Sequence, residues 1–206
     1  MTGWRALRVE DVEAVPWRGT ELVWRPLRAA LGLRAFGAGA FTASRVGQCI
    51  VEPHRESVDG RGHEEVYVVL EGRARFTLDG EAVDAPAGTC VFVPPQVERV
   101  AVAVEVPATV LAFGADPGGA YAVAGSEWTD RARPFLRTDP ERARRVLAEG
   151  RAEVGETPGL LVGVALLAAA DGRTDDARTA LARAIEGNPA VRQAADADPD
   201  LAQLLS

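Results

Sequence analysis

The chain of 206 residues contains no lysine, a single asparagine and only two cysteines. Positive charge therefore comes from arginine alone, and the formal net charge of -7 argues against a nucleic-acid partner, which requires clustered positive charge. Cys49 and Cys90 are too few for a disulfide framework, and both fall in expected strands, where we expect buried free thiols. No apolar run approaches the roughly 20 residues that span a bilayer, and the first residues lack the apolar core of a signal peptide. The sequence predicts a cytoplasmic protein with no nucleic-acid and no membrane partner.

What the sequence does contain is two halves with different periodicity. From about residue 20 to residue 114, apolar and polar residues alternate with period two, and turn signals separate the runs. Asp79-Gly80 is the strongest of these signals, because both residues tolerate the positive φ of a two-residue hairpin. Many short strands at this spacing predict a β-barrel or sandwich.

After about residue 138 the pattern becomes helical. Asp139-Pro140-Glu141 is typical of a helix start, with an N-cap, a first-turn proline and an acidic residue that compensates the helix dipole. We expect this helix to reach about Arg151, and further helices over 158–170, 174–186 and 198–205. The predicted organisation is therefore a β domain with an N-terminal extension over 1–125, a linker over 126–137 and a helical domain over 138–206.

Two segments carry motif spacing that is known from one protein family. Glu65 and Gly72 have the spacing with which the family's first motif ends, and His54 fits the first of its two histidines. Glu56 occupies the position of the second histidine. The gap between Glu56 and Glu65 is longer than usual, so residues 57–61 look like a loop insertion.

The second motif extends from Gly88 to Pro94, and Arg99 occupies the position where the motif has a histidine. With both motifs, residues 35–114 resemble the cupin superfamily, whose members are small jelly-roll β-barrels that hold a metal or a small molecule in the lumen. The resemblance predicts a mainly β domain of this kind, followed by an α-helical part. It also implies a homodimer, because single cupin barrels often pair through their sheets.

Side-chain alternation indicates what would line such a lumen. If the faces that carry His54, Glu56, Glu65 and Arg99 point inward, these residues form a polar end, and Tyr67 lies deeper. The opposite assignment, with the same faces in solvent, fits the alternation equally well.

A metal is one possible occupant. His54, His63 and Glu65 would form a two-histidine, one-carboxylate set for Fe, Mn, Ni or Zn if the inserted loop turned His63 inward. Arg99 argues against a metal, because a permanent cation repels a divalent ion and could pair with Glu65 instead.

We therefore expect a small-molecule-binding protein with a degenerate metal site. The Arg99 guanidinium favours carboxylates and other oxyanions, and Tyr67, Glu56 and Glu65 would complete the ligand-binding set. The predicted ligand is a small acidic or carbonyl compound. His54 or His63 would act on it as the catalytic acid or base. Two alternatives stay open: a metal-dependent dioxygenase or isomerase/cyclase that uses His54, His63 and Glu65, and a protein-interaction adaptor that acts through its helices.

The helical half has a pattern of its own. Small residues between Pro158 and Pro189, among them Gly172 and Ala177, have spacing similar to one tetratricopeptide repeat. A peptide-binding groove needs about three such repeats, and this segment offers at most one and a half. The predicted role is a cap on the barrel or an oligomer contact, and the combination resembles bacterial proteins that join a cupin barrel to such a tail.

Overall fold

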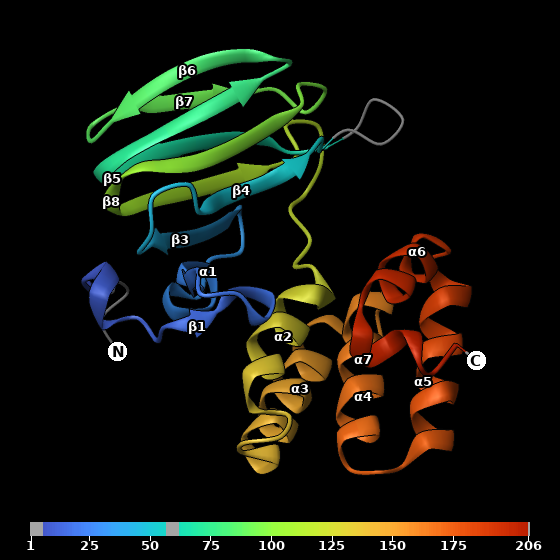
Figure 1. Ribbon diagram of the computed structural model, residues 1–206. Helices are drawn as coiled ribbons and strands as arrows, with labels where there is room; N and C mark the ends of the chain where they lie inside the picture. The colour runs from blue at the N-terminus through green and yellow to red at the C-terminus, as the bar shows by residue number, and fades with distance from the viewer. Residues whose placement is uncertain (1–5, 57–61, 206) are drawn as a thin grey trace. The chain divides into compact units, whose positions relative to one another are not determined.

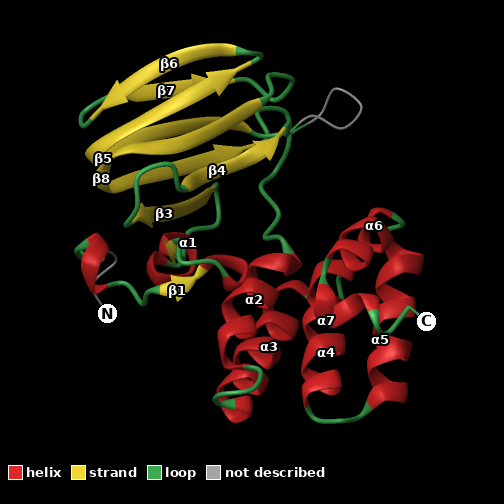
Figure 2. Ribbon diagram, viewed as in Figure 1, coloured by secondary structure: helices red, strands yellow, loops and turns green. Residues whose placement is uncertain are grey.

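The computed structural model describes residues 6–56 and 62–205, so the predicted loop insertion at 57–61 lies outside the described residues. The chain divides into two compact units, Met1–Ala122 (the strand unit) and Val123–Ser206 (the helical unit). Figures 1 and 2 show strands and helices separated in this way. The strand unit contains β1 (Val15–Pro16), β2 (Val23–Arg25), β3 (Gly37–Ala43), β4 (Cys49–His54), β5 (Glu64–Leu78), β6 (Glu81–Pro86), β7 (Cys90–Val93) and β8 (Arg99–Ala115), with helix α1 (Leu27–Leu31) and the 3-10 turns η1 (Val9–Asp11) and η2 (Trp17–Gly19).

The strands form one antiparallel sheet that folds over on itself. Its path runs β1-β2-β3-β8-β5-β6, and β4 and β7 pair with β8 and β5 respectively. The Asp79-Gly80 hairpin is confirmed, since Leu78 pairs with Glu81 across it. The mainly β domain predicted from the alternation is therefore present, in an antiparallel arrangement.

β5 and β8 each pass through both layers of this folded sheet. The rings of Tyr67 and Phe76 lie 5.4 Å apart, although nine residues of straight strand would span about 30 Å. β5 must therefore turn back between them, and its pairing with β8 is irregular from Val69 to Arg73, where the turn occurs. β8 accompanies β5 throughout, since Glu65 pairs with Gly114 and Leu78 pairs with Arg99.

Gly72 permits this turn. Its φ is +68°, and a Cβ at this position would lie 2.3 Å from the carbonyl oxygen of Pro107 and 2.5 Å from that of Glu105. Both obstacles are backbone atoms, so a side chain could not be accommodated by a change of rotamer. The turn signal at Gly72 thus marks a corner inside one continuous strand, and residues 105–108 of β8 pack against it. We call this the Gly72 corner.

The alternation predicted for β8 is confirmed. Arg99, Ala101 and Ala103 are buried, whereas the valines between them are only partly buried. β4 differs, because Ile50 and Val51 are both buried and the pairing with β8 shifts on either side of Val51. The alternating strand face that was expected to carry His54 and Glu56 is therefore interrupted by bulges.

The prediction for the cysteines was half correct. Cys49 and Cys90 are free thiols, but both are exposed rather than buried. The reason is the strand pleat: Ile50, Val91 and Val93 occupy the inward positions next to them, so the cysteines point outward.

The helical unit has more helix than the sequence predicted. Asp139 is the N-cap of its helix as expected, and its side chain accepts a hydrogen bond from the backbone N–H of Arg142 at 3.0 Å. The predicted linker 126–137 is mostly helical instead, and its Trp128 and Ala132 are buried in the core of this unit. The elements are α2 (Gly125–Ala132), η3 (Arg133–Phe135), α3 (Pro140–Val154), α4 (Pro158–Ala170), α5 (Thr174–Gly187), α6 (Ala190–Ala197) and α7 (Pro199–Ala202).

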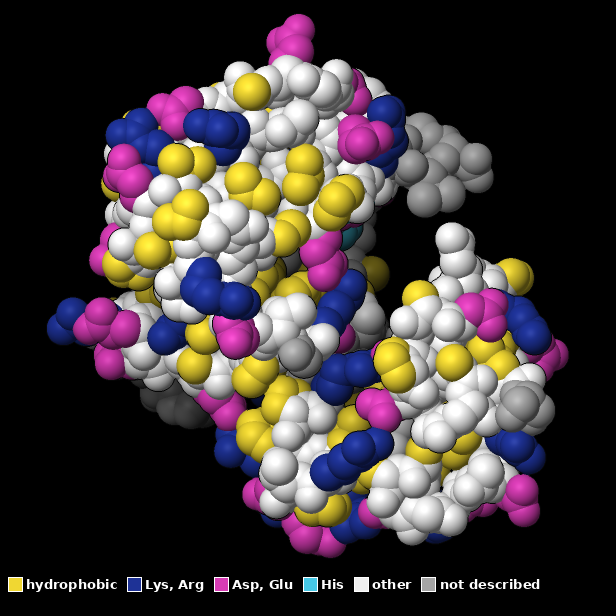
Figure 3. Space-filling model, in the orientation of Figure 1, with side chains coloured by type: hydrophobic (Ala, Val, Ile, Leu, Met, Phe, Trp, Pro, Cys, Tyr) yellow, Lys and Arg dark blue, Asp and Glu magenta, His cyan; other side chains and the backbone are white. Residues whose placement is uncertain are grey.

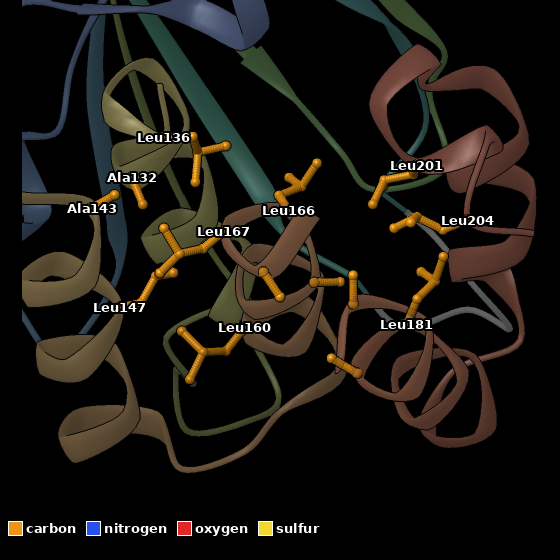
Figure 4. Packing of buried hydrophobic residues seen from close by; sticks show 14 of the residues in the cluster. Ala132, Leu136, Ala143, Leu147, Leu160, Leu166, Leu167, Leu181, Leu201 and Leu204 are labelled. Carbon is orange, nitrogen blue, oxygen red and sulfur yellow. The ribbon is translucent and has the colours of Figure 1, made fainter. Parts of the chain in front are cut away.

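Helix α4 is the centre of the helical unit. Its leucines meet Leu147 of α3 and Leu181 of α5, and Figure 4 shows these side chains converging between the helices. Gly163 lets α2 approach, because a Cβ there would lie 2.5 Å from the hydroxyl of Thr129. This burial on several sides explains why α4 is almost wholly apolar.

Two surface observations concern partners. Among the helices of the described residues, none combines the length and the apolar character needed to cross a bilayer. Acidic and basic side chains are interspersed on the visible face of each unit (Figure 3), and many arginines are paired, as Arg73 is with Asp84 and Glu105.

Candidate functional site

The polar residues predicted from the motifs meet at one end of the strand unit. His54 ends β4 and pairs with Arg99, the first residue of β8. Glu65 is the second residue of β5, and Glu56 follows β4 after one residue. Because β5 and β8 both start at this end and turn back at the Gly72 corner, the site lies at the end remote from that corner. We call it the mouth.

His54 is the centre of the group. Its Nε2 lies 3.3 Å from Oε1 of Glu56 and 3.7 Å from Oε2 of Glu65. Its Nδ1 lies 2.7 Å from the backbone carbonyl oxygen of Glu52. A carbonyl oxygen only accepts, so Nδ1 must carry a proton, and Nε2 is the atom that faces the two carboxylates.

The two carboxylates shift the protonation of this group. Their hydrogen bonds raise the pKa of His54 to about 10, even though partial burial opposes the charged form. His54 in return holds the pKa of Glu56 below its usual range. At neutral pH the side chain of His54 is therefore an imidazolium between two carboxylates.

Glu65 is fixed by neighbours on both sides. Oε2 accepts a hydrogen bond from the hydroxyl of Tyr67, a residue that is almost fully buried. Burial and the negative charge of Glu65 raise the pKa of the Tyr67 hydroxyl, so it stays protonated and remains a donor. A Cβ on the neighbouring Gly114 would lie 3.1 Å from Cγ of Glu65, so the glycine leaves room for this carboxylate.

Arg99 is the most unusual residue of the mouth. Its side chain is 0% exposed, and its Nε lies 3.7 Å from Oε2 of Glu65. Nη2 donates to the carbonyl oxygen of Pro94 at 2.9 Å, whereas Nε and Nη1 have no hydrogen-bond partner. An unsatisfied buried donor costs about 1–3 kcal/mol, and more when it is charged. Two of the three guanidinium nitrogens, Nε and Nη1, thus lack a hydrogen-bond acceptor.

His63 lies at the edge of the mouth and outside the central group. Its Nδ1 is 3.9 Å from Oε2 of Glu56, and its side chain is 39% exposed. Its ring lies 6.0 Å from that of Tyr121, a residue that the sequence did not indicate. Motif spacing could not have indicated Tyr121, because it follows the last strand and belongs to neither motif.

Among the described residues, the group that could hold a metal ion consists of His54, Glu56 and Glu65, whose ligand atoms lie within 4.8 Å of one another. It shares two members with the predicted set and has Glu56 in place of His63. A family model described as a cupin domain matches residues 47–113. Residues 47–113 form a cupin domain. The domain thus covers β4 to β8, the strands that carry the mouth.

Solved structures similar to the chain include proteins that are themselves described as cupins. A cupin protein from Bacteroides fragilis is 21% identical, covers 60% of this chain and 93% of its own, and has a TM-score of 0.42. A sugar phosphate isomerase of the cupin superfamily from Silicibacter pomeroyi is 19% identical, with coverage of 53% and 74% and a TM-score of 0.45. No curated protein matches the chain. Likeness at this level says nothing about the ligand or the reaction of this cupin domain.

The donor set of the mouth fits a divalent transition metal. One imidazole and two carboxylates are suitable ligands for Mn, Fe or Zn, and the Nδ1–H of His54 is held by a backbone carbonyl, as is usual for a metal-binding histidine. The charges also fit: Arg99 offsets one of the two carboxylates, which leaves the net charge of -1 that three histidines and one glutamate of the cupin motif would supply.

Proposed function

We propose that the mouth of this cupin domain binds a small ligand with an acidic or carbonyl group. The observation that carries the proposal is Arg99, a fully buried guanidinium in which the nitrogens Nε and Nη1 have no hydrogen-bond partner. Structures rarely leave such groups unsatisfied, and a site built to bind an oxyanion is a physical reason for one.

The neighbours of Arg99 support this ligand class. Imidazolium His54, whose side chain is 34% exposed, adds a second positive charge at the mouth, although its two ring nitrogens already face Glu52 and the carboxylates. Tyr67 holds Glu65 in place, and Glu56 and Glu65 limit the net positive charge, which favours a small ligand with few charges. His63, at the edge and 39% exposed, would be the residue that exchanges a proton with a bound ligand.

The test is calorimetric titration of the chelator-treated protein with pyruvate, which has both a carboxylate and a carbonyl. Hydrogen bonds to a charged group contribute about 1.5–3 kcal/mol, so Arg99→Met should weaken binding roughly 10- to 150-fold. Arg75→Met removes the same charge from an exposed position on β5 and should leave binding unchanged. Equal affinities of the wild type and Arg99→Met would contradict the proposal.

A second candidate, metal-dependent chemistry as in a dioxygenase or an isomerase/cyclase, is favoured by the preformed group His54, Glu56 and Glu65. A divalent ion held there would polarise a carbonyl or carboxylate oxygen of the ligand. Metal analysis of the purified protein distinguishes the two ligand sets: Glu56→Gln should lose the metal if the group in the structure binds it, and His63→Gln should not. Loss of metal in His63→Gln alone would instead favour the set predicted from the sequence.

The outer face of the strand unit supports a homodimer. Val66 of β5 pairs with Phe92 of β7 and with Phe113 of β8, and Phe36 packs on Phe113, which gives an apolar row across neighbouring strands. Phe92 is 55% exposed and Val66 37%. We infer that a second copy covers this row. A cytoplasmic location, a tetratricopeptide-like character of the helices and an adaptor role for them remain predictions.

A further inference from the structure

We propose that the mouth binds a divalent metal and a monoanionic ligand cooperatively, because the metal and Arg99 share the negative charge of one carboxylate, Glu65, and the anion compensates Arg99 when the metal takes that charge. The inference rests on the proposed function, and it adds that each ligand promotes the binding of the other. Arg99 is then the residue that couples the two.

The sharing is visible in the contacts of Glu65. A single oxygen, Oε2, accepts from Tyr67, lies 3.7 Å from Nε of Arg99 and lies 3.7 Å from Nε2 of His54. The same carboxylate belongs to the metal-binding group. When the Glu65 carboxylate coordinates a metal ion, it stabilises the positive charge of Arg99 less. The guanidinium of Arg99 donates a hydrogen bond to the carbonyl oxygen of Pro94, and the carboxylate that it faces is that of Glu65.

Counting charges shows the direction of the effect. Glu56, Glu65 and Arg99 together have a charge of -1, and an imidazole that coordinates a metal is neutral. A divalent ion alone would therefore leave the mouth at +1, with a buried and poorly compensated guanidinium. A monoanion alone would leave the mouth at -1, because His54 keeps its second proton while no metal is bound. Both together bring the charge to zero, so each ligand lowers the cost of binding the other.

Arg99 therefore has opposite effects on two complexes. In the absence of an anion it repels the metal, and in its presence it holds the anion through the unpaired Nε and Nη1. Replacing Arg99 by methionine should tighten metal binding in anion-free buffer and remove most of the gain that an anion gives. A residue that only stabilised the fold would not produce these two opposite changes.

The experiment measures the affinity of chelator-treated full-length protein for Mn²⁺, from the electron paramagnetic resonance signal of the free ion. Titrations are compared in acetate and in acetamide, a neutral compound of nearly the same shape, with a protein-free titration to correct for complexation by acetate. For the wild type we expect acetate to lower the Kd for Mn²⁺ at least about tenfold, within the usual range of allosteric coupling, and acetamide to leave it unchanged. In Arg99→Met the effect of acetate should fall to less than about threefold, whereas Arg75→Met should behave like the wild type.

The possible results separate this inference from the proposed function. Proton NMR of acetate with metal-free protein shows whether the anion binds at all. If acetate binds but does not change the affinity for Mn²⁺, or if the protein binds no Mn²⁺, cooperativity is wrong while the anion site stands. If acetate binds neither the metal-free nor the Mn²⁺-loaded protein, both are wrong. Should Arg99→Met fail to fold, Arg99→Gln takes its place, and the comparison of acetate with acetamide on the wild type alone still decides.

Discussion

The Gly72 corner allows a quantitative test of how the strand unit is built. Replacement by alanine introduces two separate costs. Alanine at a φ of +68° is strained by about 1–2 kcal/mol, and its Cβ would lie 2.3 Å and 2.5 Å from two carbonyl oxygens of β8. Forcing extra atoms into a packed site costs typically about 1–3 kcal/mol more. We therefore expect Gly72→Ala to destabilise the strand unit by about 2–5 kcal/mol, a large part of a typical stability of about 5–15 kcal/mol.

Gly88 provides the matched control. It has a φ of +90°, but a Cβ there would have no atom within 4 Å. Gly88→Ala should therefore lower the stability by the backbone strain alone, about 1–2 kcal/mol. The difference between the two variants, about 1–3 kcal/mol, isolates the close approach of β5 and β8.

Hydrogen exchange followed by mass spectrometry is the suitable assay, because it separates peptides of β5 and β8 from those of the helical unit. The most protected amides of both strands should exchange roughly 5- to 150-fold faster in Gly72→Ala than in Gly88→Ala. Peptides of α4 and α5 serve as an internal reference. Equal exchange in the two variants would refute the crowding at the corner.

Two further predictions concern the mouth and the outer face. In metal-free protein the His54 ring should titrate near pH 10 by NMR, and Glu56→Gln should lower that value, because Glu56 is the main cause of the shift. The pKa of His54 in the folded protein lies above the unfolded value of 6.5, so its contribution to the free energy of unfolding is complete below pH 6.5 and is lost as the pH rises towards 10. If the free energy of unfolding of His54→Gln fell just as much over this pH range, the prediction would be contradicted. On the outer face, Phe92→Ser should convert a dimer into a monomer in light scattering, whereas Val164→Ser, at a partly exposed apolar position of the helical unit, should not; a wild type that is already monomeric would rule out the homodimer.

Features that depend on short stretches of chain were predictable. The hairpin at Asp79-Gly80 and the N-cap at Asp139 follow from the backbone preferences of a few adjacent residues, and the structure has both. The alternation of β8 is also present, and it is regular from Arg99 to Val104; which of its two faces points inward was left open by the sequence.

Features that depend on contacts between residues far apart in the sequence could not be predicted. Gly125 starts α2, where a Cβ would lie 2.0 Å from the hydroxyl of Thr157, so a close approach of residues far apart in the sequence explains this glycine. The bulges of β4 likewise depend on its pairing with β8. The motif spacing identified all four central residues, His54, Glu56, Glu65 and Arg99, but it could not choose between Glu56 and His63 as the third member of the metal-binding group.

The path of β5 and β8 also has a mechanical consequence. Because the two layers are halves of the same two strands, they cannot slide past one another, and widening of the mouth must be a rotation about the Gly72 corner. The two layers then move like two rigid bodies joined at a hinge, with Glu65 at the free end of one layer and Arg99 at the free end of the other. A substitution that makes the Gly72 corner more flexible should therefore change the affinity for a ligand at the mouth, although the corner lies at the opposite end of the strands from the side chains that would bind the ligand.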